Sequence, residues 1–296
     1  MNFYASGKLL LFGEYLVLRG SGCLAIPLNY GQKLQVESSK NDFFEWTSNY
    51  NDATWFSCIF SKTLEIINTS DLPKAQTLTG LMELIKERNP YLFEKGLNFY
   101  TEMNFKPEWG FGSSSTFISL LAQWSKIDPY LLLEKSFGGS GYDVACATAK
   151  TPLIYDMQSR HTAPVYLFPK ITSKILFVYS GKKKDSNEAV KQFSAETVSD
   201  DDIEKMKRII IAAANATQVD VLEEAMEESE KLLSHILKLK PVKKIFFADY
   251  RFAIKSLGAW GGDFFMASFR KEVEARKYFQ ERGYSTLFNY NELIKK

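Results

Sequence analysis

Short apolar runs separated by polar turns dominate the first half of the chain and predict β-strands. The alternation of apolar and polar positions is clearest at Lys33-Leu34-Gln35-Val36-Glu37. Two aromatic runs, 43–47 and 54–60, flank the turn-forming segment 48–52 and predict a hairpin. The strands predicted in this half are 8–12, 23–36, 43–47, 54–60, 97–105 and 153–155.

A helical period replaces this alternation at 114–124, where apolar residues recur on one face of a 3.6-residue repeat. A second helix is predicted at 78–88 and stops before Asn89-Pro90, because proline disfavours a helical conformation in the residue before it. A third is predicted at 129–135, with Asp128 as its N-cap residue.

The second half of the chain is richer in helical patterns. A segment with two prolines and little periodicity, 158–169, precedes it, so the predicted domains are 1–165 and 166–296. The helices predicted in this half are 186–196, 200–217, 219–238 and 271–282. The strands predicted there are 175–179, 245–248, 252–257, 263–269 and 284–288.

Composition narrows the class of protein. The chain has 296 residues, of which 45% are apolar and 24% charged, with a formal net charge of only +2, so neither nucleic acid nor a membrane surface is an expected partner. We find no apolar run long enough to span a bilayer and no secretory signal. The three widely spaced cysteines predict buried free thiols in a reducing cytoplasm, and two histidines exclude a histidine-rich metal site.

The segment Trp109-Gly110-Phe111-Gly112-Ser113-Ser114-Ser115-Thr116 leads directly into the helix predicted at 114–124. Glycines permit close approach of the backbone, and the first N–H groups of a helix lie at the positive end of its dipole. Such a loop suits an anion such as phosphate. An ordinary serine N-cap behind a flexible loop explains the same residues equally well.

Two charged residues follow other Gly/Ser segments: Lys8 after Ser6-Gly7, and Asp143 after Ser140-Gly141. A lysine beside an aspartate keeps the carboxylate ionised, and a carboxylate in that state can orient a hydroxyl and accept its proton during attack on phosphorus. Taken singly, each residue has a simpler explanation: Lys8 as a solvated strand-end residue, and Asp143 as an acid that complements a helix dipole.

Three motifs in order resemble those of the GHMP kinases, the superfamily of galactokinase, homoserine kinase, mevalonate kinase and phosphomevalonate kinase. The segment 5–15 (ASGKLLLFGEY) is similar to A-P-G-K-x-x-x-x-G-E-[HY], and 107–115 (PEWGFGSSS) to P-x-x-x-G-L-G-S-S-A. The segment 255–263 (KSLGAWGGD) is similar to K-x-S-G-A-G-G-G-D. In addition, 140–145 (SGYDVA) resembles the S-G-x-D-x-A segment of the mevalonate-type members, and Ser180-Gly181 with Ser186 and Val190 resembles a further loop of those members. The resemblance covers nearly the whole chain.

The resemblance implies an α+β kinase of two domains, the N-terminal one like domain 2 of ribosomal protein S5 and the C-terminal one ferredoxin-like. It implies that ATP and Mg²⁺ are cofactors and that a small-molecule acceptor, phosphorylated or carboxylated, is the partner of a monomer or homodimer. By position it assigns Lys8 to the transferred phosphoryl group and Asp143 to the acceptor. The residues that it assigns to the nucleotide are Gly110, Gly112, Ser113, Ser114, Ser115, Gly258, Gly261 and Gly262, and those to the metal are Ser114 and Glu134. Glu134 is equally well explained as a solvated helix residue.

Among the family, Tyr15, the 141–145 segment and the Gly-Gly-Asp ending look most like phosphomevalonate kinase, and Lys182-Lys183-Lys184 would suit an anionic acceptor. A solvated basic loop also explains those lysines. The alternatives are a mevalonate kinase, a diphosphomevalonate decarboxylase and a catalytically silent nucleotide-binding relative. The silent relative is motivated by two departures: Trp260 stands where the family has glycine, and only 29 residues separate Ser114 from Asp143.

Overall fold

The computed structural model describes residues 1–182, 193, 198–258, 260 and 262–294. The chain forms two compact units that interleave along the sequence. Unit 1 comprises Met1–Gly7, Tyr30–Pro107 and Phe111–Thr148. Unit 2 comprises Lys8–Asn29, Glu108–Gly110 and Ala149–Lys296. The strands β1 (Asn2–Phe12) and β2 (Cys23–Ser38) have residues in both units, so the units are not separated by one point in the sequence. The predicted domains 1–165 and 166–296 stay a prediction.

In unit 1 a mixed sheet has the strand order β5-β4-β3-β6-β2. The predicted hairpin is confirmed as β3 (Phe44–Tyr50) and β4 (Ala53–Phe60). Its two turn residues, Asn51 and Asp52, both have positive φ (49° and 59°), which matches the twist of the strands that they join. The strand β6 (Leu97–Met103) pairs parallel with β3 and antiparallel with β2, and β5 (Ile66–Thr69) was not predicted.

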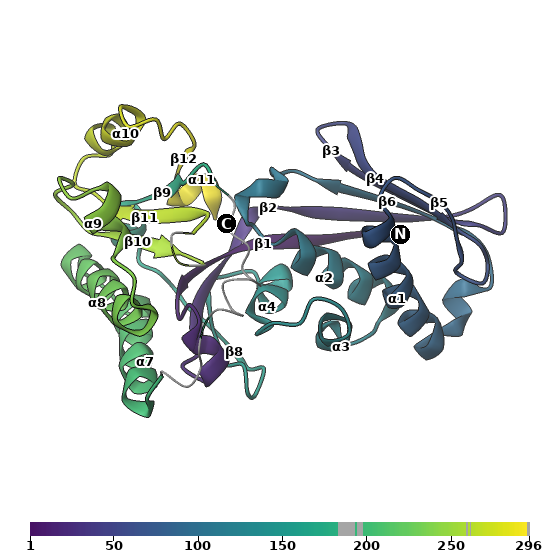
Figure 1. Cartoon of the computed structure of the whole chain (residues 1–296), viewed down its shortest axis with the longest axis horizontal. Helices are drawn as coiled ribbons and strands as arrows, with labels where there is room; N and C mark the ends of the chain where they lie inside the picture. The colour runs from purple at the N-terminus through teal and green to yellow at the C-terminus, as the bar shows by residue number, and fades with distance from the viewer. Residues whose placement is uncertain (183–192, 194–197, 259, 261, 295–296) are drawn as a thin grey trace. The chain divides into compact units, whose positions relative to one another are not determined.

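Helices cover one face of this sheet (Figure 1). They are α1 (Leu72–Arg88), α2 (Ser113–Ser125), α3 (Pro129–Glu134) and α4 (Tyr142–Thr148). Their apolar faces pack on alternate strand residues such as Trp46 and Phe99, whose rings stack at 4.8 Å. The residues between these, such as Lys33 and Tyr100, are exposed on the other face of the sheet.

In unit 2 the beginning of β2 pairs with β7 (Leu153–Tyr155), which pairs in turn with β8 (Thr162–Pro164). The strand β1 leads into a left-handed Gly13 and the single-turn 3₁₀ helix η1 (Leu16–Arg19). Across both units, Cys23, Cys58 and Cys146 are buried thiols outside any disulfide, as predicted.

The C-terminal part of unit 2 is a four-stranded antiparallel sheet with the order β10-β11-β9-β12. Its strands are β9 (Ile175–Tyr179), β10 (Ile254–Leu257), β11 (Phe264–Ser268) and β12 (Leu287–Asn289). Two long helices, α7 (Asp200–Ala214) and α8 (Val219–Leu237), pack side by side between β9 and β10 in the chain, and α10 (Glu272–Gln280) precedes β12 (Figure 1). This βαββαβ order is the ferredoxin-like topology that the resemblance to the GHMP kinases implies.

One predicted strand is wrong. The segment 245–248 was predicted as a strand, but its start lies in the short helix α9 (Val242–Phe246), which begins directly after Pro241. A short apolar run does not distinguish a buried strand from a buried helix, and a proline at the start favours the helix. The short helices α5 (Pro169–Thr172) and α11 (Tyr290–Leu293) were also not predicted. The predicted helix 186–196 lies, except for residue 193, outside the described residues.

Candidate active site

The predicted phosphate loop is a sharp turn into α2. Gly112 has left-handed dihedral angles (φ 88°, ψ 48°), and no described side chain caps the helix that begins after it. Its carbonyl oxygen accepts hydrogen bonds from Ser115 Oγ (2.9 Å) and Thr116 N (2.9 Å). The Ser115 hydroxyl therefore stabilises the turn itself, whereas Ser114 is exposed on the first helical turn. Because the first N–H groups of a helix have no partner within it, this end of α2 can bind an anion.

Asp143 lies on the first turn of α4, after the left-handed Gly141 (φ 85°). Its Oδ1 atom accepts a hydrogen bond from the Val144 N–H at 3.0 Å, and the side chain is half-buried. The helix α4 packs against α2 (Figure 1). Unit 1 therefore brings together the two helices whose N-terminal turns carry the predicted anion loop and the predicted base.

Lys8 and Gly110 meet in unit 2. The Lys8 Nζ atom donates a hydrogen bond to the Gly110 carbonyl oxygen at 3.1 Å. Gly110 has φ +67°, and a Cβ atom built on it would lie 1.8 Å from Oδ2 of Asp263, so the Asp263 carboxylate packs directly on this glycine. No catalytic or binding role was predicted for Asp263 from the sequence. Because Lys8 belongs to unit 2 and Asp143 to unit 1, their predicted pairing stays a prediction.

The third glycine turn joins β10 to β11. Gly258 has φ +75° at the end of β10, Gly262 is buried just before β11, and Gly261 lies outside the described residues. The half-buried Trp260, which replaces a family glycine, donates its backbone N–H to the Tyr15 hydroxyl at 2.8 Å. Burial raises the pKa of Tyr15, so this hydroxyl stays protonated at neutral pH. Tyr15 thereby links the first motif to the third.

The two predicted metal ligands, Ser114 and Glu134, lie at the surface of unit 1. Both residues are exposed, and Glu134 is the last residue of α3. Across the described part of the chain, no group of three or more His, Cys, Asp or Glu side chains could hold a metal ion. The ligand set itself stays a prediction.

Sequence reasoning missed a buried charge cluster in unit 2, formed by Glu14, Lys255 and Glu230. Lys255 is fully buried and forms an ion pair with Glu14. Glu230 on α8 is 3% exposed and accepts a hydrogen bond from the Ser256 N–H at 3.0 Å. The signal was present in the sequence, because Glu230 interrupts the apolar face of an amphipathic helix and Lys255 interrupts an apolar strand.

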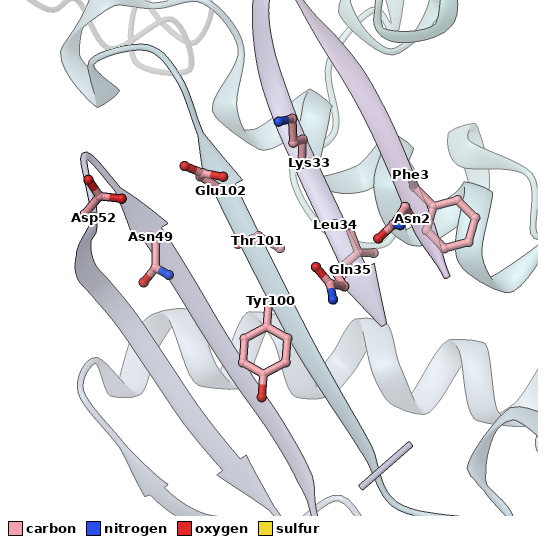
Figure 2. A pocket seen from close by; sticks show the side chains of 10 residues that line it. All are labelled: Asn2, Phe3, Lys33, Leu34, Gln35, Asn49, Asp52, Tyr100, Thr101 and Glu102. Carbon is pink, nitrogen blue, oxygen red and sulfur yellow. The ribbon is translucent and has the colours of Figure 1, made fainter. Parts of the chain in front are cut away.

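Two other features bear on the sequence predictions. A cavity of about 290 Å³ lies on the sheet face of unit 1 opposite its helices, and none of the predicted site residues lines it (Figure 2). Of the three-lysine run, Lys183 and Lys184 lie outside the described residues, as do Ser186 and Val190.

Among the described helices, none is long and apolar enough to cross a membrane.

No protein-family profile matches the chain, and a search of curated proteins finds no match. Solved structures do match over its whole length. The mevalonate kinase of Methanococcus jannaschii superposes with a TM-score of 0.72 at 17% identity, covering 100% of this chain and 98% of that one. The phosphomevalonate kinase of Streptococcus pneumoniae, in complex with phosphomevalonate and AMPPNP, has a TM-score of 0.71 at 17% identity, with 97% and 99% covered. The galactokinase of Lactococcus lactis, complexed with galactose, has a TM-score of 0.67 at 14% identity, with 99% and 92% covered. The chain therefore has the α+β fold of these GHMP kinases.

Proposed function

We propose that this protein transfers the γ-phosphoryl group of ATP to a small-molecule acceptor, and that phosphomevalonate is that acceptor. The uncapped N-terminus of α2, entered through the left-handed Gly112, is the observation that carries the proposal. It is an anion site on a fold whose solved members include three small-molecule kinases. The Streptococcus pneumoniae enzyme with this fold binds both AMPPNP and phosphomevalonate.

The site residues divide the work of phosphoryl transfer, which needs mainly positioning and charge neutralisation. The backbone of Gly110, Gly112 and the first residues of α2 binds the ATP phosphates. Lys8, held near the loop by the Gly110 carbonyl, stabilises the charge on the transferred group. Gly258, Gly261 and Gly262 line the nucleotide side of the site. When bound, Mg²⁺ neutralises the phosphate oxygens, and Ser114 with Glu134 would hold it.

Asp143 orients the acceptor. If the attacking oxygen of the acceptor carries a proton, Asp143 also accepts that proton. A hydroxyl acceptor keeps its proton until attack, so it requires a base. A phosphate acceptor has a second pKa near 6 and is largely deprotonated at neutral pH, so it requires orientation more than proton transfer. The two acceptor classes therefore predict different consequences for loss of the Asp143 carboxylate.

An ADP-release assay over mevalonate, phosphomevalonate, homoserine and hexoses tests the proposal. We expect turnover with phosphomevalonate. We also expect the Asp143→Asn variant to lower that turnover. Turnover only with another acceptor would refute the substrate and leave the reaction class standing. Release of CO₂ from the diphosphorylated acid would instead indicate a decarboxylase. ATP binding measured by calorimetry with no transfer to any acceptor would indicate a silent relative.

A further inference from the structure

The cluster of Glu14, Lys255 and Glu230 contains more negative than positive charge. The Lys255 Nζ atom pairs with Oε1 of Glu14 and donates a hydrogen bond to the Ser256 carbonyl oxygen at 2.9 Å. The second oxygen of Glu14 is buried and has no hydrogen-bond partner among the described residues. One ammonium group thus faces two carboxyl groups. With every group ionised, the cluster would hold an uncompensated negative charge away from water, which is unfavourable.

A proton resolves this imbalance. Burial raises the pKa of Glu230 to about 7, although Lys255 and the Ser256 N–H oppose the effect. Burial also raises the pKa of Glu14, against the attraction of Lys255. The charge on Glu14 also raises the pKa of Glu230, so the titrations of the two carboxyl groups are coupled. Near neutral pH the cluster passes from a balanced state with one proton to a state with a net negative charge.

The charges that act on Glu230 come from inside the cluster. The strand β10 contributes Lys255, and the turn after β1 contributes Glu14. The helix α9 contributes the Val242 N–H, which donates to Oε2 of Glu230 at 3.4 Å. The helices α7 and α5, which both pack on α8, bury only uncharged residues. Protonation of the cluster therefore depends on these three side chains.

The cluster lies next to described residues of the third glycine turn on two sides. Glu230 accepts a hydrogen bond from the N–H of Ser256, two residues before Gly258. Glu14 precedes Tyr15, whose hydroxyl accepts a hydrogen bond from the Trp260 N–H within the turn. We propose that Glu230 is a positioning residue: with Glu14 and Lys255 it forms a buried charge cluster that positions the end of β10, where the third glycine turn begins, and makes this placement depend on pH. The link to catalysis rests on the proposed function, in which this turn lines the nucleotide site.

The sign of the stability effect follows from the raised pKa. The stability that the neutral Glu230 contributes is fully present below its ordinary pKa of 4.5 and is lost as pH rises toward its folded value of about 7. The folding equilibrium constant should therefore fall by up to about 300-fold over that interval. Glu230→Gln keeps an acceptor for the Ser256 N–H, removes the titration and leaves Glu14 and Lys255 as a balanced pair.

The test compares melting temperatures from pH 5 to pH 8.5 for the unmodified chain, Glu230→Gln and Glu227→Gln. Glu227 is exposed on the same helix and serves as the control. We expect the stability of Glu230→Gln relative to the unmodified chain to increase as pH rises to about 7 and then to level off, whereas Glu227→Gln should follow the curve of the unmodified chain. Parallel curves for all three proteins would overturn the proposal. If Glu230→Gln does not fold, Glu14→Gln removes the other carboxyl group and must show the same trend.

A kinetic measurement separates positioning from stability alone. In the unmodified enzyme the KM for ATP should rise between pH 6 and pH 8 by several-fold more than in Glu230→Gln. A changed melting profile with identical KM profiles would show that the cluster only stabilises the fold, and would overturn the positioning role. Absence of phosphotransfer to any acceptor refutes the proposed function instead, and leaves the melting experiment valid because it requires no activity.

Discussion

Replacing Gly110 with alanine tests whether Asp263 packs on the phosphate loop as closely as the structure indicates. Gly110 (φ +67°) has a natural control in Gly138 (φ +64°), since a side chain at either position would adopt an unfavourable left-handed conformation. The two differ in their surroundings. A Cβ atom at Gly138 would have no neighbour within 4 Å, whereas one at Gly110 would lie 1.8 Å from Oδ2 and 2.5 Å from Cγ of Asp263.

The expected magnitudes follow from these distances. Left-handed strain costs about 1–2 kcal/mol at either glycine. Only Gly110→Ala adds a steric clash, because aspartate is short and its Cβ atom, 3.0 Å from the new methyl group, is held by the backbone at the start of β11. Overpacking of this kind costs about 1–3 kcal/mol more. In a chain of this size the difference corresponds to about 2–10 °C in melting temperature.

A double-mutant cycle identifies the clash as the cause. Melting temperatures of Gly110→Ala, Asp263→Ala and the double variant, measured by circular dichroism, give the coupling between the two positions. Removing the Asp263 carboxylate should restore about 1–3 kcal/mol of the loss at Gly110. Equal losses at Gly110 and Gly138, or additive effects of the two substitutions, would refute the packing of Asp263 on the loop.

Three other substitutions are predicted to have measurable effects. Asp143→Asn should lower kcat with little change in ATP affinity, by about 10²–10⁴-fold for a hydroxyl acceptor and by less for a phosphate acceptor; turnover near that of the unmodified enzyme with a hydroxyl acceptor would remove its assignment as a base. Lys8→Met should lower kcat through lost charge stabilisation in steady-state assays, and an unchanged kcat would contradict that role. Ser199→Ala removes the side-chain cap that accepts the Asp202 N–H at 3.2 Å, so urea unfolding should show a loss of about 1 kcal/mol with KM unchanged; full stability would show that the cap contributes nothing.

Features that depend on neighbouring residues could be predicted from the sequence. The hairpin of β3 and β4 follows from two aromatic runs joined by Asn51-Asp52, and α2 follows from its apolar period after Gly112. The ferredoxin-like order of β9 to β12 was expected from the resemblance to the GHMP kinases, since the strand and helix patterns alone included a strand at 245–248 that the chain does not form. Turn chemistry and periodicity act over a few residues, so the sequence contains their cause directly.

Features that depend on burial required the tertiary structure. The ion pair of Lys255 with Glu14 joins residues 241 positions apart, and no local pattern pairs them. The packing of Asp263 on Gly110 likewise depends on how two distant loops meet. The run at 245–248 satisfies strand and helix patterns alike, and only the structure shows that its start lies in α9. A charged side chain changes its pKa and its role when water is replaced by particular neighbours, and only the folded chain determines which neighbours those are.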